Sequence, residues 1–100
     1  MEKVKLQAQY GLYINGQWRN ASDGATYNAE SPADGSHLAV CAQGSREDVE
    51  AASAAAWKAF KTWKKTTPAQ RAALLNKIAD IIDANKEHLA MVESMDNGKP

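Results

Sequence analysis

The chain has 100 residues, of which 44% are hydrophobic and 24% are charged, and its 12 basic side chains balance its 12 acidic ones. This composition is ordinary for a soluble globular unit, and the length predicts one domain or part of one. A net charge of zero gives no field that would attract nucleic acid or an anionic membrane. No apolar run approaches the roughly 20 residues that span a bilayer, and the first residues lack the apolar segment of a secretory signal, so we expect a cytoplasmic protein.

The first half of the chain predicts short strands. Residues 1–9 are polar and mixed in charge, which favours a flexible, loosely held arm. Structure is then expected from Tyr10 onward. Segments 12–14 and 17–19 flank Asn15-Gly16, a pair that tolerates positive φ at both centres of a type I′ turn, so they predict a β-hairpin. Two further strands are expected, at 26–29 and 37–42, separated by the turn residues Ser-Pro-Ala-Asp-Gly at 31–35.

The second half predicts helices. Ser45 stands three residues before Asp48, a variant of the capping box, and an apolar stripe follows, which predicts a helix over about 46–64. Thr67, Pro68 and Gln70 have the N-cap, first-turn and box positions of a second helix. Its apolar stripe consists of Leu74, Leu75, Ile78, Ile81 and Ile82. Asn85 is expected to interrupt or bend this helix before a similar spacing resumes at Leu89, Val92 and Met95.

Few residues predict chemistry within the chain. Cys41, the one cysteine, has no histidine close in sequence, and an apolar strand position favours a buried structural thiol over a nucleophile. His37 and His88 lie 51 residues apart without metal-ligand spacing, so both are interpreted as surface or polar-packing residues. Gly98-Lys99 resembles the end of a phosphate loop, but Glu93 and Pro100 stand where that motif needs a glycine and a hydroxyl. The glycines also form no dinucleotide-binding pattern.

The apolar faces of the predicted helices exceed what the short strands could cover. A small domain has few kcal/mol of stability to spare, so such faces in water would favour self-association or instability. Other polypeptide is therefore expected to cover them.

Four stretches in this order carry a family resemblance: YINGQW, SPADG, the run from GSREDVEAASAAAW to NKIADIID, and MVESMDNGKP. Over residues 10–100 the chain resembles the amino-terminal part of NAD(P)-dependent aldehyde dehydrogenases. Its first residues are most similar to bacterial enzymes that act on acetaldehyde and other short-chain aliphatic aldehydes. The implied fold class is α/β: an amino-terminal hairpin and short strands, then about three helices, belonging to an incomplete Rossmann-like coenzyme-binding domain over 10–100.

The resemblance also implies a reaction and its partners. In the family a cysteine thiolate attacks the aldehyde, hydride passes to NAD or NADP, and a glutamate-activated water hydrolyses the thioester. These catalytic and coenzyme-binding residues lie downstream of position 100 in relatives, and neither Cys41 nor Glu93 aligns with them. The implied parent protein is a homo-oligomer, a dimer or tetramer, and the 100 residues alone are expected to be inactive.

One site implied by the resemblance falls inside the chain. Many relatives hold a structural Na⁺ or K⁺ with the aspartate of the DNGKP string and with backbone carbonyls just before the Pro-x-x-Gly turn. These positions correspond to Asp96 and to the carbonyls of Ala29 and Glu30, and oxygen ligands suit a hard cation. The chain departs from the family at Ser31, where asparagine usually precedes the proline. Asp96 could equally be a helix C-terminal turn residue without a ligand.

Two alternatives to the enzyme interpretation stay open at this point. One is a small assembly module that folds alone and dimerises through its exposed helix faces, without catalytic activity. The other is a free-standing structural helical domain with no ligand.

Overall fold

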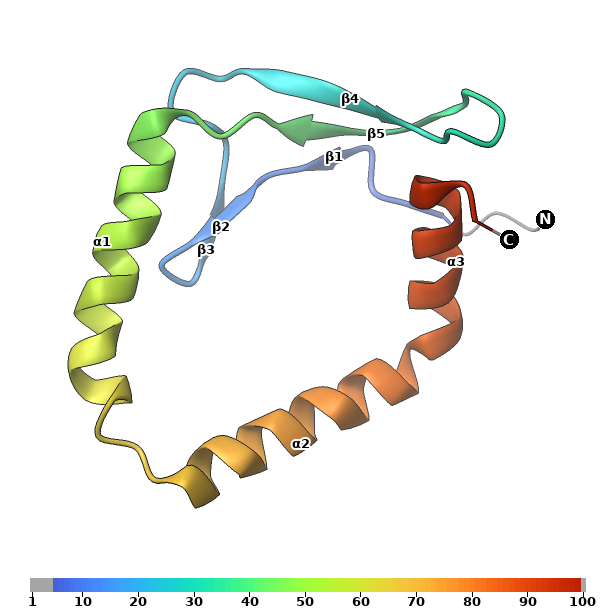
Figure 1. Cartoon of the computed structure of the whole chain (residues 1–100). Coiled ribbons are helices and arrows are strands. Elements are labelled where there is room, and N and C mark those ends of the chain that lie inside the picture. Colours follow the sequence, from blue (N-terminus) through green and yellow to red (C-terminus); the bar gives the residue numbers. More distant parts are fainter. Residues whose placement is uncertain (1–4, 100) are drawn as a thin grey trace.

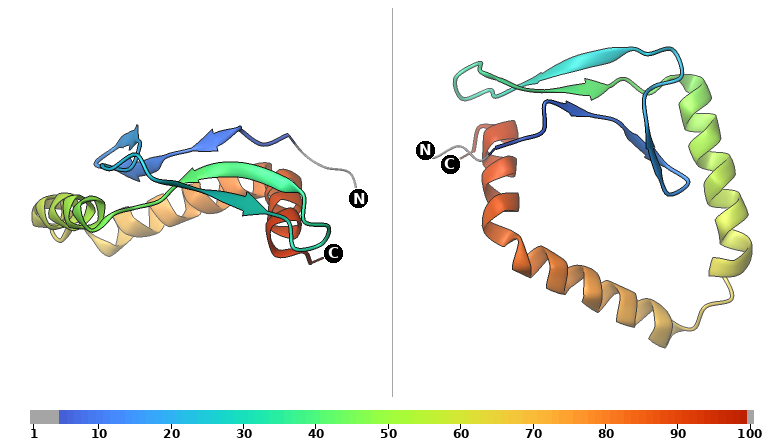
Figure 2. Two further views of the ribbon diagram at one scale, coloured as in Figure 1. Left: turned by 90° about the horizontal axis from the view of Figure 1, so that it is seen from above. Right: turned by 180° about the vertical axis from the view of Figure 1, so that it is seen from behind.

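The computed structural model describes residues 5–99, which form an open ring of short strands and helices (Figure 1). The strands are β1 (Gln9–Tyr10), β2 (Leu12–Ile14), β3 (Gln17–Arg19), β4 (Thr26–Glu30) and β5 (His37–Ala42). The helices are α1 (Arg46–Trp63), α2 (Pro68–Ala84) and α3 (Lys86–Asn97). The ring is flat, with extents of 47 × 36 × 17 Å, as the view from above in Figure 2 shows. The predicted α/β class is confirmed.

The predicted hairpin is present as β2 and β3. Leu12 pairs with Arg19 and Ile14 with Gln17 in antiparallel register. Asn15 and Gly16 have φ values of 53° and 75°, which is the left-handed geometry that a type I′ turn requires. The local sequence therefore predicts the turn of this hairpin, and the Arg19 side chain then connects β3 to α1 through Asp48.

A second, three-stranded sheet has the order β1-β5-β4. β4 and β5 are antiparallel, whereas β1 runs parallel to β5, with Gln9 opposite Val40. The Val40 N–H also donates to the Ala8 carbonyl at 3.0 Å. Within residues 5–99, regular structure thus begins at Gln9, one residue before the predicted start. Residues 1–4 of the predicted arm lie outside the described residues, and the looseness of the arm stays a prediction.

The helix boundaries follow the capping chemistry. Ser45 and Asp48 form a reciprocal capping box at α1, and Thr67 and Gln70 form another at α2. The predicted interruption at Asn85 is confirmed: its φ and ψ are −116° and 16°, and its side-chain amide donates to the Ile81 carbonyl at 2.8 Å. An asparagine side chain that bonds the preceding turn competes with the helical ladder, so α2 and α3 are separate helices.

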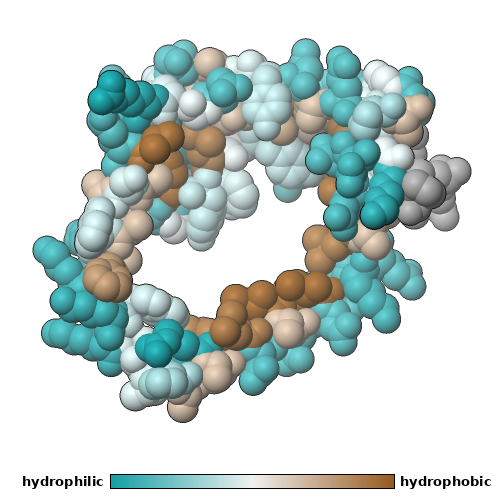
Figure 3. Space-filling view, in the orientation of Figure 1, coloured by the Kyte–Doolittle hydropathy of each residue, from teal (hydrophilic) through white to brown (hydrophobic). Residues whose placement is uncertain are grey.

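The interior of the ring is thinly packed. Among residues 5–99 the buried apolar side chains are Ala21, Ala39 and Met95. Large apolar side chains instead stay exposed along the helices, and Figure 3 shows the strongest apolar patch on α2, along the edge that faces the opening of the ring. None of the described helices is both long and apolar enough to cross a membrane. The expectation that the short strands leave helix faces uncovered is therefore confirmed.

Candidate functional site

Two segments that carry the resemblance meet in space: the end of α3 and the 31–35 turn. Gly98 follows α3 with a φ of 74°, and its N–H donates to the Ser94 carbonyl at 2.8 Å. The Ser94 hydroxyl donates to the Lys99 carbonyl. A Cβ on Gly98 would lie 2.9 Å from Pro32 Cγ and 3.3 Å from the Ala33 nitrogen. Glycine is thus needed here for its left-handed backbone and for its small size.

The 31–35 turn is closed by its own backbone. Ser31 is buried; its N–H donates to the Ser36 carbonyl at 2.8 Å, and its carbonyl accepts from the Gly35 N–H at 2.7 Å. The Ser31 hydroxyl also accepts from the Ala33 N–H at 3.4 Å. Serine therefore supports a closed turn at the position where the family usually has asparagine.

A cavity of about 390 Å³ lies between the three-stranded sheet and α3. It is mostly apolar, and its lining residues are Leu6, Tyr10, Ala29, Leu38, Ala39, Cys41, Leu89, Val92, Glu93 and Asp96. Asp96, in the last turn of α3, and Ala29, near the end of β4, are 67 positions apart in the sequence. The structure therefore brings two of the three predicted cation ligands to one cavity.

Glu30, the third predicted ligand, is not among the residues that line this cavity, and its side chain is exposed. The sheet is irregular at this point. Ala29 pairs with Ala39 but Glu30 pairs with His37, so the register shifts and Leu38 is the extra residue. A bulge of this kind disrupts the hydrogen-bond ladder and changes the direction of nearby backbone groups.

Two of the three residues predicted to supply oxygen ligands for a monovalent cation lie at this cavity, and the third does not. Asp96 and Ala29 line the same cavity, and carboxylate and carbonyl oxygens are the ligands that such ions take. Within residues 5–99 no three or more histidine, cysteine or acidic side chains are grouped so that they could hold a metal. His37 and His88 are exposed, as the sequence predicts.

Cys41 lies on β5 directly opposite Tyr27 of β4. The thiol is half-buried, less enclosed than the predicted buried thiol. Its hydrogen bond and electrostatic interaction with Tyr27 raise the pKa of that phenol, and the Asp96 carboxylate acts in the same direction. Cys41 is therefore engaged in a cross-strand pair at the edge of the cavity.

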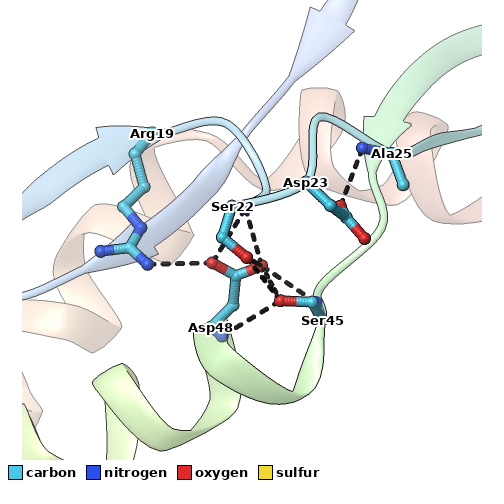
Figure 4. Close-up of polar contacts among 6 residues, drawn as sticks. All are labelled: Arg19, Ser22, Asp23, Ala25, Ser45 and Asp48. Carbon is cyan, nitrogen blue, oxygen red and sulfur yellow. Dashed lines mark hydrogen bonds and ion pairs between the residues drawn. The ribbon is translucent and has the colours of Figure 1, made fainter.

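A buried carboxylate, Asp48, joins the hairpin segment to α1 (Figure 4). It is only 2% exposed and accepts from the Ser45 N–H at 2.9 Å, from Arg19 Nη2 at 2.9 Å and from the Ser22 N–H at 3.1 Å. The Ser22 and Ser45 hydroxyls lie 2.7 Å apart beside it. These contacts connect positions up to 29 residues apart.

The same contacts determine the charge state of Asp48. The Ser45 backbone donor, the Arg19 guanidinium and the Ser22 backbone donor hold the pKa of Asp48 well below its usual range, against the opposing effect of burial. A buried carboxylate that accepts several hydrogen bonds and one ion pair is stable in its charged form. The sequence predicted the capping role of Asp48 but not its contacts with Arg19 and Ser22, for which no local signal exists. Because the carboxylate joins Arg19 and Ser22 to the first turn of α1, it fixes the hairpin segment on this helix.

Comparison with known proteins assigns the class. Residues 18–100 match the model of the "Aldehyde dehydrogenase family". A long-chain-aldehyde dehydrogenase from an Acinetobacter species is 44% identical over 98 residues, which are 98% of this chain and 20% of that protein. Solved structures include an aldehyde dehydrogenase from Bacillus cereus, with 36% identity and a TM-score of 0.88 over 99% of this chain and 22% of that one. An NAD-dependent aldehyde dehydrogenase from Sinorhizobium meliloti has 35% identity and a TM-score of 0.88, covering 96% and 20%.

The mixed α/β ring is thus an arrangement found within much longer oxidoreductase chains. The chain belongs to the aldehyde dehydrogenase family. It spans about a fifth of the length of the curated relatives that it matches.

Proposed function

We propose that these 100 residues form the amino-terminal part of an NAD(P)-dependent aldehyde dehydrogenase and contribute to its coenzyme-binding domain. The observation that carries this proposal is the family match over residues 18–100. It is supported by the relatives, which are about five times as long, and by the helix faces that stay exposed in this chain. A segment whose apolar faces are uncovered is expected to pack against further polypeptide.

The reaction proposed for the whole protein is the oxidation of an aldehyde to a carboxylic acid through a cysteine thiohemiacetal. When bound, NAD or NADP would accept the hydride. The nucleophile, the base and the coenzyme site belong to polypeptide beyond these 100 residues. Cys41 is not assigned as the nucleophile, because it interacts with Tyr27 across the sheet and does not correspond to the family's nucleophile.

The role proposed for the chain itself is to hold a structural Na⁺ or K⁺ with Asp96 and the carbonyls of Ala29 and Glu30. The shared cavity of Asp96 and Ala29 supports this site. We expect the thermal unfolding midpoint of the whole protein to rise in NaCl or KCl relative to choline chloride at equal ionic strength, because an ion that binds only the folded state stabilises it. Asp96→Asn should abolish that difference, whereas Asp80→Asn, at an exposed position of α2, should keep it. An equal salt response in Asp96→Asn would contradict the site.

The proposal also names the aldehyde substrate of the whole protein. The resemblance favours acetaldehyde and other short aliphatic aldehydes, although the Acinetobacter relative is named for long-chain aldehydes. Relative kcat/KM values over a series of linear aldehydes would decide between short-chain and long-chain substrates.

The whole protein is proposed to be a cytoplasmic homodimer or homotetramer. Light scattering of the purified protein would test this oligomeric state.

The experiment for the main proposal compares two proteins: the complete polypeptide that contains these residues and the 100-residue chain alone. Aldehyde-dependent NADH or NADPH formation is expected from the first and not from the second. Turnover by the isolated chain would show that its chemistry lies within residues 1–100, against the proposal.

A small assembly module is the second candidate, and the exposed aliphatic residues of α2 favour it. It predicts that the isolated chain is a folded dimer. A stable monomer by light scattering would reject it.

A further inference from the structure

Positive charge is concentrated at the corner of the ring where α1 ends and α2 begins. Residues 51–79 contain six basic side chains and no acidic one, although the whole chain is neutral. Five residues at the end of α1 are here called the corner patch: Trp57, Lys58, Lys61, Lys64 and Lys65. All five are exposed, Trp57 by 71%. The net charge of zero, which gave no reason to expect a membrane partner, therefore conceals a local positive field.

The corner patch lies on the side of α1 that faces away from the hairpin. A row of alanines on α1 lines a groove against the hairpin turn: Ala52, Ala55, Ala56 and Ala59. With 3.6 residues per turn, Trp57, Lys61 and Lys64 lie on the opposite side of the helix from this row. Figure 3 shows hydrophilic side chains along the outside of the same corner. Because lysine is almost never fully buried, this side is expected to stay at the surface of the complete protein.

The four lysines of the corner patch are not neutralised within the ring. Among residues 5–99 none of them forms an ion pair, and the nearest acidic residues in the sequence are Glu50 and Asp80. Lys64 Nζ lies 5.8 Å from the centroid of the Phe60 ring, a contact that does not cancel its charge. Like charges three or four positions apart on a helix repel one another, so an anionic partner would stabilise the patch.

The chemistry of the corner patch fits a lipid surface better than a protein or a nucleic acid. Protein interfaces are enriched in arginine and depleted in lysine, and every basic residue of the patch is a lysine. Single-stranded nucleic acid follows a positively charged groove, whereas the patch extends over roughly 12 Å of one helix end. Clusters of four or more lysines on an amphipathic helix are typical of anionic-lipid binding, and tryptophan is enriched at the level of lipid headgroups.

We propose that the corner patch attaches the protein reversibly to the surface of a membrane that contains anionic lipids. The four ammonium groups contact lipid phosphates and carboxylates, and the Trp57 indole lies among the headgroups. Each lysine near such a surface strengthens binding roughly fivefold, so the four together favour anionic over neutral membranes by roughly several hundredfold. This interaction goes beyond the proposed function and depends neither on the aldehyde nor on the cation site.

The test uses the complete polypeptide in a sedimentation assay with sucrose-loaded vesicles at low salt. One set of vesicles contains phosphatidylcholine alone, and the other contains phosphatidylcholine and phosphatidylserine in equal parts. The patch variants are Trp57→Ala and the double variant Lys61→Gln with Lys64→Gln. The matched control, Lys77→Gln with Lys86→Gln, removes the same charge at exposed positions outside the patch.

We expect the wild type to sediment with the anionic vesicles and to be released by high salt, because salt screens these charges. The patch double variant should bind them roughly 30-fold more weakly, Trp57→Ala at least severalfold more weakly, and the control as strongly as the wild type. A wild type without preference for anionic vesicles, unchanged binding in both patch variants, or an equal loss in the control would overturn the proposal. Binding of polyglutamate or of a single-stranded oligonucleotide, without binding of vesicles, would overturn it in favour of an acidic protein or a nucleic acid.

Discussion

The contact between the end of α3 and the 31–35 turn depends on the absence of a side chain at Gly98, and Gly98→Ala tests it. At a φ of 74°, alanine costs about 1–2 kcal/mol relative to glycine. Its Cβ would also lie 2.9 Å from Pro32 Cγ, part of a ring that cannot rotate away. Overpacking of this kind costs a further ~1–3 kcal/mol. The contact should therefore weaken by about 2–5 kcal/mol.

Hydrogen exchange in the complete polypeptide reports this loss, because local opening of the contact exposes the amides that it protects. Gly98→Ala should accelerate exchange in the 31–36 segment and at the end of α3, by roughly 30-fold to several thousandfold, since each 1.4 kcal/mol is a factor of ten.

Gly35→Ala is the matched control for this experiment. Gly35 has a φ of 73°, but nothing lies within 4 Å of a Cβ placed on it. It therefore carries only the backbone cost, a factor of roughly 5 to 30, and should leave the end of α3 unchanged. If Gly98→Ala accelerates exchange in the 31–36 segment no more than Gly35→Ala does, the two segments are not packed as described.

Three further predictions concern the caps and the buried carboxylate. Asp48→Asn removes the negative charge of the carboxylate that accepts from Arg19 and from the Ser22 N–H. Hydrogen exchange at Ser22 should therefore accelerate, while exchange within β4 and β5 should stay the same. An unchanged exchange rate at Ser22 would contradict the network. Because the folded pKa of Asp48 is lowered from 3.8, its stabilising effect is complete above about pH 5 and is lost as the pH falls below about 4. Protection at Ser22, corrected for intrinsic exchange, should follow that course, and a loss between pH 7 and pH 5 would be inconsistent with it. Thr67→Ala removes the N-cap acceptor of α2 and should destabilise the start of that helix by about 1 kcal/mol. Thr62→Ala, inside α1, is the control and should not destabilise α2. An equal loss of helical signal in far-UV circular dichroism for the two variants would refute the capping role of Thr67.

Local chemistry accounts for what could be predicted from the sequence. The Asn15-Gly16 turn, the capping boxes at Ser45 and Thr67, and the interruption at Asn85 each depend on residues within about four positions. Such signals act through backbone dihedral preferences and hydrogen bonds that need no distant partner. For most of these elements, the predicted boundaries of the strands and helices accordingly differ from the observed ones by no more than one residue.

Contacts between distant segments could not be predicted in this way. The parallel pairing of Gln9 with Val40 and the bond from Arg19 to Asp48 join positions 29 or more apart, and nothing near either residue specifies its partner. The cation ligands differ again: Asp96 and Ala29 were named only because of the family resemblance. The structure adds that both border one cavity, while Glu30 is not among its lining residues.

The central claim is that these residues are the amino-terminal part of a much longer enzyme, and the nucleotide sequence past codon 100 tests it most directly. We predict that the reading frame continues for about four times the length of this chain, since 98 aligned residues are 20% of the Acinetobacter relative, and that it encodes the cysteine and glutamate of the proposed reaction. A stop codon directly after codon 100 in the native gene would contradict the account.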